Sequence, residues 1–378
     1  MRIGIDARFF GPKTGGGGIG RYVAELVTHL QEIDHQNEYV IFLRKENFHE
    51  CVITNRRFFK QLMDVPWYTI REQLLLPNFV RRARVDFMHY PHWNVPIFST
   101  TPFLVTIHDL ILIEDRKSAH ATTKGALVHG FKYAGFRTVI ESAIHRSRHI
   151  ISISNYSKQS VLNHFGIKEK KISVIPNGII PAKTAKNVSF SRLGVFEPYF
   201  LYVGSAYPHK NLHTMLDAFA KFTQNDQYTQ LVIAGRRDVF SQELERYAKA
   251  QNISSEQLRF IDFPTDEEVA ALYKSARLFI FPSRLEGFGL PPLEAMSHGT
   301  PVAAAQASSL PEVLGKAAWY FDPDDSSALA RLMQQATDNP EMMATKVTEG
   351  LHQSSTFTWL QTAEKTLDLY NSFHLLHK

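Results

Sequence analysis

The sequence predicts an α/β protein with two domains, each built on a parallel sheet covered by helices. Its 378 residues are too many for one ordinary hydrophobic core. Short apolar runs of strand length alternate with helical patterns almost throughout, which is typical of parallel sheets with helical crossovers. The alternation stops at residues 181–198, a polar stretch that we interpret as a linker and loop, and then restarts.

In the first half, apolar runs predict the strands and helical periodicity predicts the helices. The strand-like runs are residues 1–9, 39–43, 86–91, 102–110 and 149–154. Apolar residues recur at helical spacing from Ile19 to Ile33, and a longer helical pattern covers Lys124 to Arg148.

The second half repeats the alternation. Its strand-like runs are residues 199–205, 230–236, 258–263, 277–283, 301–305 and 317–322. We therefore expect an N-terminal domain over residues 1–182 and a C-terminal domain over residues 183–355. A final helix within residues 356–378 is expected to pack back on the N-terminal domain.

Composition indicates a globular protein of a reducing compartment. Apolar residues make up 44% of the chain, so disorder is not indicated. Cys51 is the only cysteine, which excludes an intrachain disulfide. Asp6 and Arg8 interrupt the apolar N-terminus, and no apolar run reaches the roughly 20 residues that span a bilayer. We therefore expect a cytoplasmic protein without a secretory signal.

Charge is distributed unevenly. Residues 1–180 hold 24 Lys and Arg against 15 Asp and Glu, a net charge of +9, while residues 181–378 hold 18 against 22, a net charge of −4. This favours an anionic partner for the first domain, although solvated helix faces give the same imbalance. From Lys124 to Arg148, basic and aromatic residues are interleaved, which fits docking on an anionic membrane and fits core packing equally well.

Two loops at predicted strand ends are suited to binding anions, because ligands of open α/β sheets bind beyond the carboxyl ends of the strands. The loop "GPKTGGGGIGR" (11–21) opens a helix, and its glycines let backbone N–H groups approach a ligand. A flexible surface loop has the same composition. In "YVGSAYPHKNL", Lys210 precedes a helix and can reach a phosphate, or it can be solvated beside an asparagine cap.

The segment "EGFGLPPLE" places two carboxylates across a turn that opens a helix. Pro291 or Pro292 fits the first helical position, and Gly299 fits the helix end. We expect Glu286 on the loop, where its carboxylate is suited to a sugar hydroxyl. We expect Glu294 in the first helical turn, where it grips a ribose diol or merely complements the helix dipole.

Together these motifs resemble the retaining nucleotide-sugar glycosyltransferases of family 4, which have the GT-B fold of two Rossmann-like domains. The segment from Glu286 to Glu294 looks like that family's motif of two glutamates separated by seven residues. The stretches "GGGGIGRY", "TIHDL", "ISISNYS", "VIPNGI" and "YVGSAYPHKNL" fall in the family's order. The resemblance covers nearly the whole chain, and motifs that agree with one another reinforce the assignment.

The resemblance implies three catalytic residues. His108 contacts the donor sugar at the transfer site, although a hydrogen-bonded histidine at a strand end is the plainer interpretation of that residue alone. Lys210 stabilises the leaving diphosphate, and Glu286 holds donor-sugar hydroxyls near the reacting carbon.

The resemblance also implies donor-binding positions, which are Gly17, Gly18, Ser205, Arg236, Phe288, Gly289, Leu290 and Glu294. The two glycines lie near the diphosphate, the amides of residues 288–290 meet the phosphates, and Glu294 meets the ribose. Many family members have arginine where this chain has Ser205, so Lys210 or Arg236 has to supply the missing charge. No metal or other cofactor is expected, because we interpret the Asp322–Asp325 run as a helix cap.

Resemblance to bacterial mannosyltransferases that build O-antigen or other surface polysaccharides implies GDP-mannose as donor. It also implies a polyprenyl-diphosphate-linked glycan as acceptor and a peripheral position on the inner face of the cytoplasmic membrane. A UDP- or ADP-sugar donor and a nucleotide-sugar epimerase stay open as alternatives. A nucleic-acid-binding protein is compatible with the pI near 9.1, but no zinc spacing, aromatic RNA-binding motif or basic stripe supports it.

Overall fold

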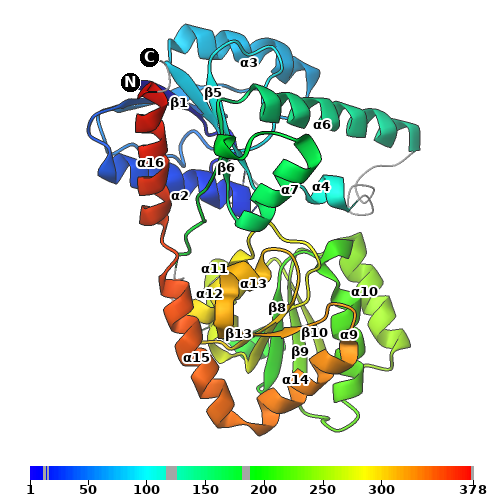
Figure 1. The fold of residues 1–378 in the computed structure, drawn as a ribbon. Coiled ribbons are helices and arrows are strands. Elements are labelled where there is room, and N and C mark those ends of the chain that lie inside the picture. Colours follow the sequence, from blue (N-terminus) through cyan, green and yellow to red (C-terminus); the bar gives the residue numbers. More distant parts are fainter. Residues whose placement is uncertain (12–13, 15–16, 116–125, 181–187, 376–378) are drawn as a thin grey trace. The chain divides into compact units, whose positions relative to one another are not determined.

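A computed structural model describes residues 1–11, 14, 17–115, 126–180 and 188–375. Its contacts divide the chain into two compact units. The first unit comprises residues 1–110, 122–178 and 358–378, and the second comprises residues 111–121 and 179–357. Each unit contains one sheet whose paired strands are all parallel, with helices packed around it (Figure 1). The predicted α/β class with two parallel sheets is confirmed.

The first unit has a seven-stranded sheet in the order β3-β2-β1-β4-β5-β6-β7. Its strands are β1 (Arg2–Asp6), β2 (Glu38–Leu43), β3 (Phe58–Leu62), β4 (Phe87–Tyr90), β5 (Phe103–Ile107), β6 (His149–Ser152) and β7 (Ile172–Val174). Its longer helices are α2 (Gly18–Ile33), α3 (Ile70–Ala83), α6 (Ala126–Arg146), α7 (Asn155–Phe165) and α16 (Trp359–Leu375), and η1 (Glu169–Lys171) precedes β7.

The C-terminal helix α16 packs in the first unit, beside α2 (Figure 1). Trp359, Ala363 and Tyr370 of α16 belong to the same buried core as Ile3 of β1 and Leu26 of α2. The last segment of the chain therefore completes the core that its first segment begins.

The second unit has a six-stranded sheet in the order β10-β9-β8-β11-β12-β13. Its strands are β8 (Tyr199–Val203), β9 (Gln230–Gly235), β10 (Leu258–Asp262), β11 (Leu278–Phe281), β12 (Val302–Ala305) and β13 (Ala318–Phe321). Its helices are α4 (Ile111–Glu114), α8 (Phe190–Leu193), η2 (Pro208–Lys210), α9 (Leu212–Phe222), α10 (Val239–Ala250), α11 (Asp266–Ser275), α12 (Leu290–Ser297), α13 (Leu310–Leu314), η3 (Gly315–Ala317), α14 (Ser326–Asp338) and α15 (Pro340–Ser355).

Each strand-like run of the sequence contains a strand, but two strands were not predicted. These are β3 and β7, the two edges of the first sheet. Edge strands are buried less completely, so the apolar run that marks a central strand is weakened: in β3 only the first residue is buried. In addition, the short helix α8 lies inside the stretch expected to be a loop.

Strand order predicts where each sheet binds ligands. The order reverses between β1 and β4 in the first sheet and between β8 and β11 in the second. In open α/β sheets, the crevice beyond the carboxyl ends of the strands at such a switch point is where ligands bind. Of the described helices, none is long and apolar enough to span a bilayer.

Candidate functional site

In the second unit, a lysine and a glutamate meet at the switch point. Lys210 ends η2, which follows β8, and Glu286 follows β11. Lys210 Nζ donates to Glu286 Oε1 at 2.6 Å, with side chains only 16% and 10% exposed. The structure thus brings together two of the predicted catalytic residues as a largely buried ion pair, a charge-assisted contact of the stronger kind.

Backbone contacts hold the two loops together. The Arg284 amide donates to the carbonyl of His209 at 2.8 Å. The side chain of Asn211 donates to the carbonyls of Pro282 at 3.2 Å and Pro323 at 2.8 Å, and Asn211 itself has left-handed backbone angles with φ of 58°. These contacts fix the loop that carries Lys210 to the loop that carries Glu286.

Two serines that sequence reasoning missed fix the backbone of Glu286. Ser308 Oγ accepts from the Glu286 amide and Ser309 Oγ donates to the Glu286 carbonyl, both at 3.0 Å. The serines precede α13 and lie 22 and 23 positions after Glu286 in the chain, so only the fold brings them to the Glu286 backbone. Their sequence signal, a serine pair before a helix-starting proline, is too common to have indicated a role.

The turn after Glu286 differs in detail from the prediction. Gly289, with φ of 95°, precedes α12, whose first residue is Leu290, so Pro291 and Pro292 occupy the second and third helical positions. Because proline has no N–H, the amides that this turn offers to an anion are those of residues 288–290. The described hydrogen bonds give none of these three amides a protein acceptor. The Phe288 side chain is buried against Phe357 at 5.5 Å.

Glu294 lies one or two residues further into the helix than predicted, just beyond the first turn. Because α12 starts at Leu290, Glu294 is its fifth residue, and the first turn contains no acidic residue. This position does not favour the interpretation that Glu294 merely complements the helix dipole, since that effect falls off within the first turn. The carboxylate is half-buried, and the Tyr273 hydroxyl donates to its Oε2 at 3.5 Å. As predicted, the helix ends before Gly299, which has φ of 77°.

Ser205, which stands where many members of the resembled family have arginine, lies just after the end of β8. The Ser205 carbonyl accepts from the Tyr202 hydroxyl at 2.8 Å. A Cβ on Gly235 would come within 2.1 Å of the Gly204 carbonyl oxygen, so the ends of β8 and β9 are in direct backbone contact. Arg236, directly after Gly235, is exposed at this edge. The next residue, Arg237, instead pairs with Glu245 and Asp262.

A second cation, Arg284, was not predicted. Its Nη2 donates to Asp324 Oδ1 at 2.5 Å. Asp325, rather than Asp322 or Asp324, is the cap of α14, because its carboxylate accepts from the Ala328 amide at 2.8 Å. Asp322 accepts from the Asp324 amide. Within the described residues, no group of three or more His, Cys, Asp or Glu side chains could hold a metal ion.

In the first unit, the predicted glycines lie at the start of α2. Gly17, with φ of 75°, precedes the helix and Gly18 begins it; both are exposed, and a Cβ on either would meet nothing within 4 Å. Positive φ explains the glycine at position 17. Among the described residues, none lies close enough to Gly18 to require a glycine there.

His108 follows β5, and its environment fixes its protonation. Its Nε2 lies 2.8 Å from the carbonyl oxygen of Pro91, which can only accept, so Nε2 carries the proton and Nδ1 presents a lone pair. Burial lowers the pKa of His108 to about 4. The ring stands edge-on to Tyr22, with centroids 4.9 Å apart and planes at 88°. His108 is therefore a neutral hydrogen-bond acceptor near neutral pH.

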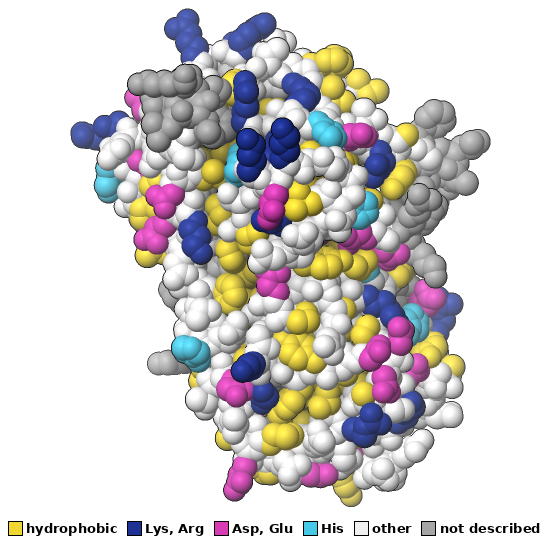
Figure 2. Space-filling view, in the orientation of Figure 1, with side chains coloured by type: hydrophobic (Ala, Val, Ile, Leu, Met, Phe, Trp, Pro, Cys, Tyr) yellow, Lys and Arg dark blue, Asp and Glu magenta, His cyan; other side chains and the backbone are white. Residues whose placement is uncertain are grey.

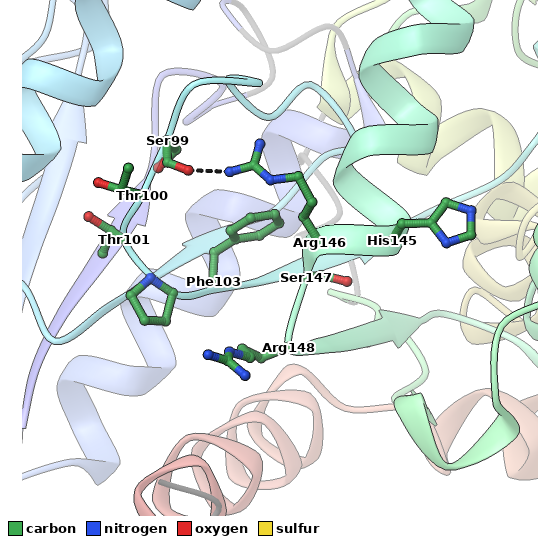
Figure 3. A pocket seen from close by; sticks show the side chains of 9 residues that line it. Ser99, Thr100, Thr101, Phe103, His145, Arg146, Ser147 and Arg148 are labelled. Atoms are coloured by element: carbon green, nitrogen blue, oxygen red, sulfur yellow. Dashed lines mark hydrogen bonds between the residues drawn. The ribbon is translucent and has the colours of Figure 1, made fainter.

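The first unit also has a hollow at the opposite end of its strands from His108. It is lined by residues 99–103 and 145–148, at the amino ends of β5 and β6, whereas His108 follows the carboxyl end of β5. Figure 3 shows Arg146 reaching toward Ser99, whose carbonyl accepts from its guanidinium. Because ligands of such sheets bind at the opposite edge, we do not include this hollow in the candidate site.

Figure 2 shows the charge difference between the units on one face. Lys and Arg side chains are frequent over the first unit, while acidic and basic side chains are interspersed over the second. This agrees with the net charges of the two halves and leaves the first unit as the more basic one.

Comparison with known proteins assigns both halves of the chain to glycosyltransferase families. The sequence profile "Glycosyltransferase Family 4" matches residues 16–183, and the profile "Glycosyl transferases group 1" matches residues 187–350. The chain is 24% identical to the O-antigen chain mannosyltransferase RfbU of Salmonella typhimurium, over 87% of this chain and 90% of that one. It is 30% identical to the O-antigen chain mannosyltransferase B of Escherichia coli, over 61% of this chain and 63% of that one.

Solved structures share the fold. The sucrose-phosphate synthase of Thermosynechococcus elongatus has a TM-score of 0.78 at 19% identity and covers all of both chains. Anabaena HepE, solved with UDP and glucose, has a TM-score of 0.75 at 18% identity over 98% of this chain and all of that one. With two profiles in the family's order and this fold, the chain belongs to the GT-B glycosyltransferases that join a family 4 half to a group 1 half.

Proposed function

We propose that the chain is a retaining mannosyltransferase that moves α-mannose from GDP-mannose to a polyprenyl-diphosphate-linked glycan during surface-polysaccharide synthesis. The observation that carries the proposal is the Lys210–Glu286 pair at the switch point of the second sheet. A cation and a carboxylate stand there at the place where an α/β sheet binds its ligand. The names of the mannosyltransferase relatives support the choice of sugar, and with it GDP-mannose over a UDP- or ADP-sugar.

The proposed transfer breaks the bond between mannose C1 and the β-phosphate oxygen, whose electron pair stays with GDP. The acceptor hydroxyl oxygen bonds to C1 on the face that the phosphate leaves, and its proton passes to that phosphate oxygen. Configuration is retained without an enzymic nucleophile. Lys210 and the amides of residues 288–290 stabilise the charge that grows on the diphosphate. Glu286 accepts from sugar hydroxyls, and His108 accepts at Nδ1.

Two further roles belong to the proposal. Glu294 accepts hydrogen bonds from the ribose hydroxyls. Arg236 replaces the arginine that the family has at Ser205, since the β8 and β9 ends touch through Gly204 and Gly235. With these cations neutralising the diphosphate, the reaction needs no metal ion.

Donor identity and stereochemistry can be measured directly. We expect GDP to raise the melting temperature more than UDP or ADP, because a ligand stabilises the folded state by RT ln(1 + [L]/Kd). GDP-mannose should then turn over to an α-mannoside, identified by the anomeric NMR coupling, in the presence of EDTA. A β-mannoside would contradict retention. Loss of turnover in EDTA with rescue by Mg²⁺ would contradict metal independence, and sugar interconversion without transfer would favour the epimerase.

We also propose that the first unit docks on an anionic membrane, but through fewer residues than the sequence pattern suggested. Phe136 packs on Trp93 at 4.7 Å, Arg137 lies over the Phe165 ring, and Arg146 donates to the carbonyls of Ile97 and Ser99. These contacts favour core packing for part of the segment. Lys132 and Arg148 are exposed, while Lys124 and the side chain of Phe131 lie outside the described residues.

Sedimentation with liposomes tests this docking. We expect recovery with anionic vesicles that falls with salt, since each basic residue near the surface contributes about 1 kcal/mol. The double variant Lys132→Glu/Arg148→Glu should lose most of the recovery. The double variant Lys249→Glu/Lys274→Glu, which changes two exposed lysines of the second unit by the same total charge, should retain it. Equal recovery with neutral vesicles would remove the membrane proposal and leave the transferase proposal standing.

A further inference from the structure

A buried chain of hydrogen bonds links the C-terminal helix to the strand that carries His108. The Tyr370 hydroxyl of α16 lies 2.6 Å from His89 Nδ1, and His89 Nε2 lies 2.8 Å from Thr106 Oγ1. Thr106 Oγ1 is in turn 3.1 Å from the Tyr22 hydroxyl. All four side chains have no exposed surface. They lie in one unit, although Tyr370 is separated from His89 by 281 positions in the chain.

The far end of this chain reaches His108. Thr106 precedes His108 by two residues, so their side chains lie on the same face of the strand end. The Tyr22 ring, whose hydroxyl Thr106 holds, supports the His108 ring edge-on at 4.9 Å. His108 Nε2 also donates to the Pro91 carbonyl. The His108 ring is thus held by one backbone acceptor and by the Tyr22 ring, and the position of the Tyr22 ring depends on the buried chain.

Helix α16 touches this support twice. Besides Tyr370, the Trp359 ring contacts the Tyr22 ring, with centroids 6.0 Å apart at 65°. We infer that Tyr370 is a positioning residue: through His89 and Thr106 it holds Tyr22, and Tyr22 aims the His108 lone pair at the donor sugar. The inference rests on the proposed role of His108 in sugar binding and gives the C-terminal helix a part in the site.

The protonation of His89 suits such a chain. Burial and the nearby His108 lower the pKa of His89 to about 3, so the ring is neutral near neutral pH. A neutral imidazole donates at one nitrogen and accepts at the other. Both nitrogens are used here, one toward Tyr370 and one toward Thr106, so losing either partner leaves a buried ring nitrogen unsatisfied and releases the ring from its orientation.

The test compares Tyr370→Phe with Tyr39→Phe. Both remove one hydroxyl from a buried tyrosine of the first unit, and both hydroxyls make a 2.6 Å hydrogen bond. The Tyr39 hydroxyl donates to Asp34, however, and that bond has no part in the chain to Thr106. The pair therefore separates loss of a buried hydrogen bond from loss of the link to His108.

We expect Tyr370→Phe to lower kcat about tenfold with the KM for the donor within twofold, because a slightly misplaced group costs rate more than binding. The ring resonances of His108, in protein labelled at histidine, should shift. Thr106→Val should act in the same way. Thr106→Ser keeps the hydroxyl, so kcat and the His108 resonances should stay at their parent values. Tyr39→Phe should leave both unchanged.

Two outcomes would overturn the inference. One is a Tyr370→Phe variant with the parent kcat and unshifted His108 resonances. The other is an equal loss of kcat in Tyr370→Phe and Tyr39→Phe, which would show a merely structural role. If the protein transfers no sugar from any donor, the proposed function fails, and the His108 resonances still test the positioning by themselves.

Discussion

Replacing Glu286 by glutamine is expected to lower kcat by roughly ten- to hundredfold while the protein stays folded. The carboxylate is largely buried and holds Lys210 at 2.6 Å, and its backbone is fixed by Ser308 and Ser309. Glutamine keeps the shape and loses the charge. Hydrogen bonds to charged groups contribute about 1.5–3 kcal/mol, which corresponds to that range of rates. Single-turnover kinetics with saturating donor measures the effect.

Lys210→Ala should weaken both donor binding and turnover, because the ammonium interacts with the diphosphate before and during its departure. It also leaves the Glu286 carboxylate buried without its cation, so part of the loss comes from that residue. The double variant Lys210→Ala/Glu286→Gln separates the two contributions. If the two single losses simply add in the double variant, the pair does not work as a unit.

Glu294→Gln is the matched control for Glu286→Gln, since it removes the same charge from the same segment. Glu294 lies on α12 and accepts from Tyr273 of α11, whereas Glu286 lies on a loop and accepts from Lys210. We expect it to weaken binding of free GDP, measured by titration calorimetry, with a smaller change in kcat. A Glu294→Gln variant that binds GDP as tightly as the parent would contradict the ribose role, and the Glu286 prediction would be unaffected.

The central strands were predictable because a strand that is buried on both faces consists of consecutive apolar residues. β11 and β12 are completely buried, and both were predicted. The edge strand β3, with one buried residue of five, carries no such run and was missed. Helix starts were less predictable: the two prolines of "LPPLE" fit several positions, and the helix begins at Leu290, one residue before the first of them, which moves Glu294 out of the first turn.

The site residues divide in the same way. Motifs in the sequence point to Lys210 and Glu286. Their contact, and the hydrogen bonds with Ser308 and Ser309, join segments from three separate loops. Arg284 was missed because one arginine in a loop resembles any solvated cation until its contact with Asp324 is seen. Local patterns predict which residue types are present, whereas pairing across loops depends on strand order, which a single sequence leaves open.

Lowering the pH from 7 to 5 is expected to destabilise the first unit by several kcal/mol. Burial lowers the pKa of His89 to about 3 and that of His108 to about 4, and it holds the pKa of His92 well below its usual value. In the unfolded chain each histidine titrates near 6.5. Below that pH the unfolded state binds protons that the folded state does not, so stability falls by about 1.4 kcal/mol per pH unit for each such histidine.

Two carboxylates of the first unit oppose this trend. Burial raises the pKa of Glu72 and that of Glu25, so the folded state gains protons there as the pH falls, which stabilises it. The histidines prevail because unfolded carboxylates titrate near 4.3, below this pH range, and because Arg8 lies 2.6 Å from Glu72 and limits its shift. Burial also lowers the pKa of His149, which adds to the loss. Hydrogen exchange of the amides in β4 and β5, corrected for the intrinsic pH dependence, measures the loss, with β9 of the second unit as the internal comparison. His92→Phe should reduce the slope by about a third if the three histidines contribute equally. Unchanged protection of β4 and β5 between pH 7 and 5 would mean that these rings gain protons in the folded state, and it would contradict the lowered pKa of His89, His92 and His108.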